Sequence, residues 1–196
     1  MFHVERWIMK YFFGFLASIG LVILVFILVL RGFGGKSNTP QANPLTDYAN
    51  SDTLVRMTVD GPIVSDQQHQ AYRITIGRSE TRVETLQGYE YDAIDTRTYN
   101  NNQEGFTNFL RAIELAGFAK GIKDVSSQAK DERGVCATGD RFVFEVIDGT
   151  SQKQRYWSTS CGNNGTFKGN TEQVKRLFDR QVPTPDFTQL TGHLRL

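Results

Sequence analysis

The two cysteines, Cys136 and Cys161, are the side chains of this sequence with the greatest capacity for chemistry. Neither belongs to a Cys-x-x-Cys pair, and the three histidines, His3, His69 and His193, are scattered along the chain. A zinc site needs about four ligands at characteristic spacings. The sequence therefore predicts no metal-ligating residue, and the cysteines call for another explanation.

A β-hairpin between the cysteines predicts that they form a disulfide. Residues 141–147 and 154–159 are rich in aromatic and β-branched side chains, as strands are, and Asp148-Gly149 is a typical two-residue hairpin turn. Cys136 lies 12 positions before this turn and Cys161 lies 12 positions after it, so they face each other across the open end of the hairpin. Facing Cα atoms lie about 4.5 to 5.5 Å apart, which is within disulfide reach.

In this register both cysteines share a sheet face with Phe142, Phe144 and Trp157. A disulfide across the 24 intervening residues would stabilise the fold by about 3 kcal/mol in the chain-entropy model. It would also place the domain outside the cytoplasm, where disulfides persist. The alternative is a pair of buried free thiols in a reducing compartment.

Other reactive side chains do not form a recognisable catalytic group. Glu90 with Asp92, and Asp131 with Glu132, are acidic pairs of the kind that general acid–base catalysis uses, but shifted pKa values require burial that a sequence does not show. Ser160 lies beside Cys161 with no histidine nearby in the sequence. The glycine-rich residues 162–165 lack the lysine of a phosphate loop and predict a polar turn. We therefore predict no catalytic residue, no cofactor-binding residue and no cofactor.

The charge distribution argues against nucleic acid as a partner. Residues 52–196 hold 18 Lys and Arg against 19 Asp and Glu, a net charge of -1, and no run of like charges stands out. Nucleic-acid-binding proteins concentrate Lys and Arg on one face.

The elements that position these residues alternate between extended and helical patterns. Four short extended segments separated by glycine-rich turns, at 54–59, 71–76, 82–86 and 91–99, predict an antiparallel meander. A helix follows, with Asn101 and Glu104 as its capping box, the apolar stripe Phe106, Phe109, Leu110 and Ile113, and a stop at Gly117. A second helix begins at Asn170, with Gln173 in its capping box and Val174, Leu177 and Phe178 on its apolar face, and Pro183 ends it. The pattern predicts an α+β domain, an antiparallel sheet with two helices packed on it.

Residues 11–31 predict a helix that spans a membrane once. From Tyr11 to Leu30 there are 20 positions without a charged side chain. At 1.5 Å per residue such a helix is about 30 Å long, the thickness of a hydrocarbon core. This is longer than the apolar part of a cleaved signal peptide, so we predict an uncleaved signal-anchor.

The predicted organisation is a cytoplasmic N-terminus at 1–10, the transmembrane helix, a flexible linker at 32–51 rich in Gly, Pro, Ser and Asn, and an extracytoplasmic α+β domain at 52–196. Basic residues flank the helix almost equally on both sides, so the orientation rests on the disulfide.

The segments 131–136 and 157–162, together with Gly61-Pro62-Ile63-Val64 and Gln87-Gly88-Tyr89, resemble a family of single-pass membrane-anchored proteins of small-genome candidate-phylum bacteria. Those proteins also have an N-terminal helix, a Gly/Pro linker and a small extracytoplasmic domain with two cysteines. The resemblance covers most of the chain after Asp52 and implies no known activity, so no functional residue follows from it.

These features predict a protein of the cell membrane whose outer domain is a non-enzymatic binding or structural module for an envelope protein or surface component. Tyr89, Tyr91 and Tyr99 lie in a polar segment and are the candidate partner contacts. Two alternatives stay open. The first is a hydrolase-like envelope enzyme whose site forms only in three dimensions. The second is a pilus-like assembly component, which the acidic Glu5 before the apolar helix suggests.

Overall fold

A computed structural model describes residues 18–24, 44–122 and 131–191. The chain divides into two units, Met1–Gln41 and Ala42–Leu196. In the first unit residues 18–24 are helical and their side chains are exposed. The other positions of the predicted transmembrane helix, the N-terminal residues 1–10 and linker residues 32–43 lie outside the described residues. Among the residues that are described, none of the helices combines the length and the apolar character needed to cross a bilayer.

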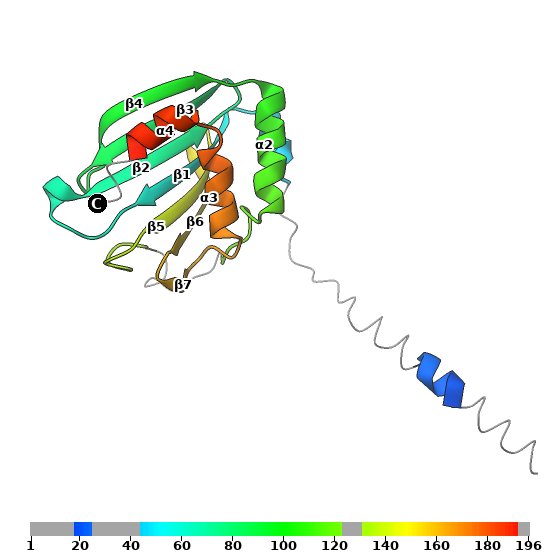
Figure 1. Cartoon of the computed structure of the whole chain (residues 1–196). Helices are drawn as coiled ribbons and strands as arrows, with labels where there is room; N and C mark the ends of the chain where they lie inside the picture. The colour runs from blue at the N-terminus through cyan, green and yellow to red at the C-terminus, as the bar shows by residue number, and fades with distance from the viewer. Residues whose placement is uncertain (1–17, 25–43, 123–130, 192–196) are drawn as a thin grey trace, which may run out of the picture. The chain divides into compact units, whose positions relative to one another are not determined.

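The second unit is built on one antiparallel sheet of seven strands in the order β4-β3-β2-β1-β5-β6-β7 (Figure 1). The strands are β1 (Thr53–Asp60), β2 (Gln70–Ile76), β3 (Glu80–Gln87), β4 (Asp92–Asn100), β5 (Arg141–Asp148), β6 (Ser151–Thr159) and β7 (Gly162–Gly165). The first four form the predicted meander. Helix α2 (Gln103–Leu115) then carries the chain back across the sheet, so that β5 pairs with β1 and not with β4.

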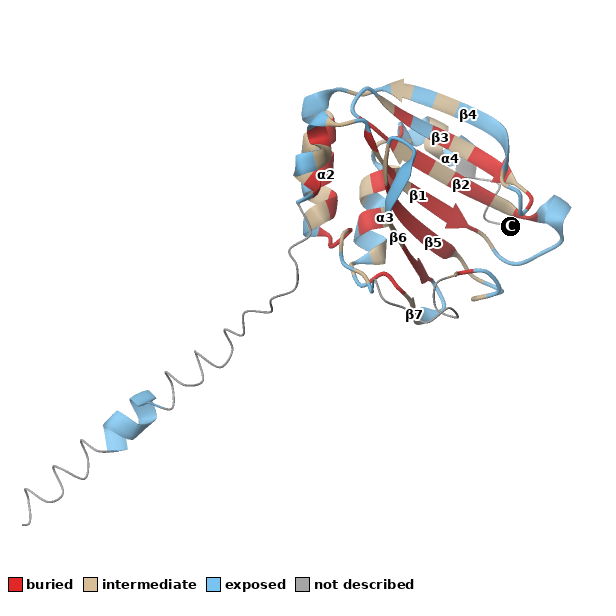
Figure 2. Ribbon diagram, turned by 180° about the vertical axis from the view of Figure 1, so that it is seen from behind, coloured by how far each residue is buried: buried red, intermediate tan, exposed pale blue. Residues whose placement is uncertain are grey.

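The helices cover one face of the sheet, as the prediction of an α+β domain requires (Figure 1). Period-two alternation sends Val55, Met57 and Val59 of β1 to this face. There they join the apolar stripe of α2 and that of α3 (Thr171–Asp179), including Phe109 and Phe178, whose rings meet edge to face. Figure 2 shows how far each strand is buried by this packing. The central strands are largely buried, whereas edge strand β4 is mostly exposed.

Both predicted helices are present, with one cap displaced. The Asn170 side chain accepts a hydrogen bond from the Gln173 backbone N–H and caps α3, as predicted. The N-cap of α2 is Asn102 and not Asn101, because Asn102 accepts from the Gly105 N–H at 2.8 Å. Asn101 is used instead to join the helix to the β2–β3 turn, where its side-chain amide donates to the carbonyl of Gly77. A local capping pattern could not reveal that tertiary bond.

Replacing Asn102 by alanine should lower the free energy of unfolding by about 1 kcal/mol, because the Gly105 N–H loses its acceptor. The matched control is Asn108→Ala on an exposed position of the same helix, which should cost nothing because alanine is the better helix former. Urea denaturation followed by circular dichroism measures both. Equal losses for the two variants would show that Asn102 is not the cap.

Two predicted boundaries are wrong, and the structure adds a third helix to the two that were predicted. The linker predicted over 32–51 ends early, because Leu45–Asn50 form a 3-10 helix, η1, whose Leu45 and Ala49 are buried in the core. Residues 162–165, predicted as a polar turn, form the short edge strand β7. A further helix, α4 (Thr184–Thr191), follows α3. Its Asp186 carboxylate accepts hydrogen bonds from the side chains of Arg97 and Tyr99 in β4. In each case contacts with distant parts of the chain order a segment of weak local preference.

The predicted disulfide is confirmed, with Cα atoms of Cys136 and Cys161 5.6 Å apart. The predicted hairpin register is wrong, because the turn falls one residue later and the ladder shifts between Val146 and Ile147. Trp157 is therefore opposite Val143, on the other face from Phe142 and Phe144. A displacement by an odd number of residues moves side chains to the opposite face. The cysteines lie beyond the last paired residues of the two strands and close the mouth of the hairpin from there.

Candidate functional site

The sheet face opposite the helices, which we call the open face, carries charged side chains. On the central strands they form cross-strand pairs, such as Arg56 with Glu145 and Arg73 with Glu84. Toward one end of this face is a cavity of about 820 Å³, which we call the open-face cavity. Its volume is within the range of about 300–1,000 Å³ that is usual for small-molecule sites.

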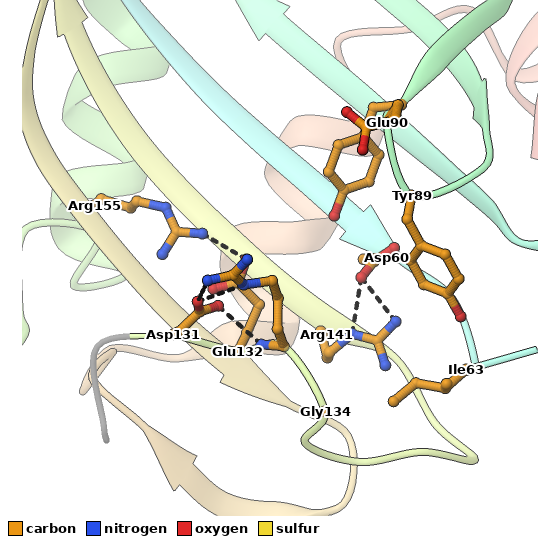
Figure 3. A pocket seen from close by; sticks show the side chains of 11 residues that line it. Asp60, Ile63, Tyr89, Glu90, Asp131, Glu132, Gly134, Arg141 and Arg155 are labelled. Atoms are coloured by element: carbon orange, nitrogen blue, oxygen red, sulfur yellow. Dashed lines mark hydrogen bonds and ion pairs between the residues drawn. The ribbon is translucent and has the colours of Figure 1, made fainter. Parts of the chain in front are cut away.

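The base and the two walls of the open-face cavity come from different parts of the chain (Figure 3). The ends of β1 and β5 supply Asp60 and Arg141 at its base. The turn between β3 and β4 supplies one wall, residues 89–91. The segment before β5 supplies the opposite wall, residues 131–134, and Arg155 of β6 lies beside it. Segments far apart in the sequence therefore meet here only because β5 pairs with β1.

Asp60 and Arg141 form a buried ion pair at the base. They are paired across β1 and β5, and their exposed fractions are 4% and 2%. The Arg141 guanidinium contacts Asp60 Oδ2 through two nitrogens, at 2.8 and 2.7 Å, and donates to the carbonyls of Gly61 and Val135. Arg141 thus joins β1 to the wall segment, and each of its contacts is with an acceptor.

His69 completes the base and is fully buried. Its Nε2 lies 2.6 Å from Asp60 Oδ1 and its Nδ1 lies 3.2 Å from the carbonyl oxygen of Pro62. Both ring nitrogens therefore already have partners within the protein. The ring also stacks on that of Tyr89, with centroids 4.1 Å apart. We conclude that His69 has a structural role. Its contacts hold the base and the Tyr89 wall together, and neither ring nitrogen is left to act on a ligand.

The disulfide fixes the wall formed by residues 131–134. It ties the segment that leads into β5 to the end of β6. The Ile63 backbone N–H donates to the carbonyl of Ala137 at 2.8 Å, which attaches the same segment to the loop after β1. Gly139 packs against the disulfide so closely that a Cβ atom there would overlap both sulfur atoms and the Ser160 hydroxyl. The cysteines therefore position the cavity wall and close the hairpin at the same time.

Acidic residues of this wall are paired with arginines. The Asp131 carboxylate forms an ion pair with the Arg133 guanidinium, and the hydrogen bond from Arg133 lowers the pKa of the Asp131 carboxyl. Glu132 Oε1 accepts from Arg155. Glu132 Oε2 is buried and has no hydrogen-bond partner within residues 44–122 and 131–191. The acidic pair that the sequence singled out therefore lies at the cavity, but with arginines as partners and not as two free carboxylates.

Of the three predicted contact tyrosines, the structure brings Tyr89 and Tyr91 together at the cavity. The Tyr89 hydroxyl donates to the carbonyl of Val64 at 2.8 Å, and its ring is 42% exposed. Tyr91 adopts φ 60°, a left-handed conformation that is unfavourable for a bulky side chain. Among the non-glycine residues of the described ranges, only Tyr91 and Cys136 have positive φ. Such conformations concentrate at functional sites, and here each belongs to a segment that bounds the cavity.

Burial, and next the negative charges of Asp60 and Glu132, raise the pKa of Tyr91 to about 12. Its hydroxyl therefore remains protonated at neutral pH and can donate a hydrogen bond, but it cannot act as a base or a phenolate nucleophile.

Tyr99 does not belong to this site. Its hydroxyl donates to Asp186 of α4 at 3.0 Å, on the helix-covered face of the sheet. Alternation along β4 and the unexpected helix α4 place Tyr99 on the other side of the sheet from Tyr89 and Tyr91, so the three tyrosines do not form one surface, and partner contact by Tyr99 stays a prediction.

Sequence reasoning missed Asp60, His69 and Arg141. Asp60 appeared only as the first residue of a turn, and Arg141 as the first residue of a strand. A charged residue at the end of a β-rich segment is a weak signal by itself. Its meaning depends on which strands pair, and β1 and β5 are 81 residues apart at this contact.

Comparison of the chain with protein-family models finds no match, and comparison with curated proteins finds none either.

Proposed function

We propose that this protein is a single-pass membrane protein whose extracytoplasmic domain binds a ligand in the open-face cavity without transforming it. The observation that carries the proposal is the organisation of the cavity itself. Its base is a buried network in which Asp60, His69 and Arg141 are bonded to one another, and its walls are held by a disulfide and a stacked aromatic pair. Preorganised polar walls of this kind favour binding, because little conformational freedom remains to be lost.

The membrane anchor and the topology of the proposal are supported by the sequence and the disulfide. Twenty uncharged positions from Tyr11 to Leu30 suit a bilayer-spanning helix. The disulfide between Cys136 and Cys161 suits an oxidising compartment. Together they support a cytoplasmic N-terminus and a domain in the cell envelope.

The alternative function, a hydrolase-like enzyme, would need a nucleophile with an adjacent base. Within residues 44–122 and 131–191 the described histidine is engaged on both nitrogens, and both cysteines are in the disulfide. These bonds support binding over hydrolysis as the function of the cavity.

The proposal is tested by site-specific crosslinking in intact cells that express the full chain. A photoreactive amino acid replaces Glu90, which lines the cavity and is exposed, and in a control it replaces Arg111, which is exposed on α2. We expect a discrete adduct from position 90 and none from position 111. A reporter fused after Leu196 should be active on the outer side of the membrane. The same adducts from both positions, or none from position 90, would overturn the binding role of the cavity. A reporter active only in the cytoplasm would overturn the topology.

A further inference from the structure

We propose that the open-face cavity recognises a cationic hydrogen-bond donor, a primary ammonium group carried on an organic ligand, and that Glu132 Oε2 is the acceptor. This inference rests on the proposed function, because it assumes that the cavity is a ligand site. It adds the chemical class of the ligand and the atom that selects it.

The first observation is an incomplete hydrogen-bond set on a buried acid. The Glu132 side chain is 7% exposed, and only its Oε1 is bonded, to Arg155. Its Oε2 is shielded and lacks a hydrogen-bond partner among the described residues. Leaving a buried charged acceptor unsatisfied costs more free energy than leaving a neutral one unsatisfied. A ligand that donates to Oε2 recovers this cost, whereas one that only accepts does not.

The second observation is the charge balance of the lining. Four acids, Asp60, Glu90, Asp131 and Glu132, face three arginines, Arg133, Arg141 and Arg155, so these side chains sum to -1. Asp60 is matched by Arg141, Asp131 by Arg133, and Glu132 by Arg155. The unmatched negative charge therefore lies on Glu90, on the wall opposite Glu132. A cation bonded to Glu132 Oε2 is attracted by this charge as well.

An organic cation fits these groups better than a metal ion does. Within residues 18–24, 44–122 and 131–191, no three His, Cys, Asp or Glu side chains are grouped closely enough to hold a metal. The cavity volume of about 820 Å³ leaves room for a body attached to the ammonium group. Such a group occurs on free diamines and on lysine side chains of peptides, and the experiment separates these sources.

The test is a set of isothermal calorimetric titrations of the full-length protein in detergent micelles, which measure the affinity for each probe. The probes are 1,5-diaminopentane, the blocked tripeptide Ala-Lys-Ala, the neutral 1,5-pentanediol and the dianion glutarate. We expect at least one amine probe to bind, and pentanediol and glutarate not to bind. Binding of the diamine alone points to a small-molecule ligand, whereas binding of the tripeptide alone points to a lysyl side chain.

Glu132→Gln should weaken binding of the amine at least tenfold, because a charge-assisted hydrogen bond is lost. Glu90→Gln, on an exposed position that does not hold the fold, should weaken it about twofold to fivefold through loss of charge alone. Glu80→Gln is the matched control, since Glu80 pairs with Arg82 on the surface outside the cavity lining, and it should leave affinity unchanged.

The inference fails if neither amine binds, or if Glu132→Gln binds the amine as well as the unaltered protein does. Binding of glutarate with no binding of the amines would also overturn it while leaving the cavity as a ligand site. The crosslinking from position 90 tests that broader proposal independently, so the two failures are distinguishable.

Discussion

Arg141→Met should lower the free energy of unfolding by about 3–5 kcal/mol, the largest loss that we expect from a change of one side chain in this domain. Methionine retains much of the length of arginine but neither its charge nor its donors. The variant therefore leaves the Asp60 carboxylate buried, at 4% exposure, without the guanidinium that contacts it at 2.7 Å.

The size of the effect follows from burial and from the number of bonds lost. A buried carboxylate whose partner is removed bears the full cost of its desolvation. The carbonyls of Gly61 and Val135 lose a donor at the same time. His69 still contacts Asp60 through Nε2, and for this reason we expect a folded but weakened protein.

Chemical denaturation of the full chain, followed by circular dichroism, measures this loss. The control is Arg82→Met, which makes the same substitution in a surface pair whose side chains are 49% and 44% exposed. Exposed pairs contribute about 0–1 kcal/mol, so this variant should be close to the unaltered protein. Losses of similar size for the two variants would mean that the buried Asp60–Arg141 pair contributes no more to the free energy of unfolding than an exposed surface pair does.

Replacing both cysteines by serine, Cys136→Ser with Cys161→Ser, should cost about 3 kcal/mol, because the unfolded chain is then no longer constrained by a closed loop. The two cysteines are separated by 25 positions, and the entropy of that loop sets the expected magnitude. Reduction of the unaltered protein should cause the same loss, and the double variant should be insensitive to reductant.

The disulfide should also have a local effect on the open-face cavity. It holds the segment that carries Glu132, whereas the ladder of β1 to β6 ends before either cysteine. Loss of the disulfide should therefore release this wall while the sheet stays folded. Hydrogen exchange measures the difference, since exchange of the Ile63 N–H that donates to Ala137 should be accelerated more than exchange of the β1 amides, which reflects the global loss of stability alone. Equal acceleration in β1 would show that the disulfide stabilises the domain only as a whole.

Local physical chemistry was enough for much of the fold. Short runs of extended residues bounded by glycine-rich turns placed β1 to β6, because β-branched and aromatic side chains favour strands and glycine favours the turns between them. The apolar stripe from Phe106 to Ile113 placed α2, and Asn170 placed the start of α3, because a cap bonds residues only three positions away. The disulfide was also predictable, since hairpin connectivity brings Cys136 and Cys161 together even when the register is displaced.

The sequence by itself thus determined strands β1 to β6, helices α2 and α3, the pairing of the cysteines and the apolar stretch from Tyr11 to Leu30. Only the tertiary structure decided that β5 returns to β1, that Tyr99 is covered by α4, and that Asp60, His69 and Arg141 form one buried network. The physical reason is the sequence separation over which each kind of interaction acts. Alternation and capping act over a few residues, whereas the cavity requires partners up to 81 positions apart, whose approach is set by the packing of the whole sheet.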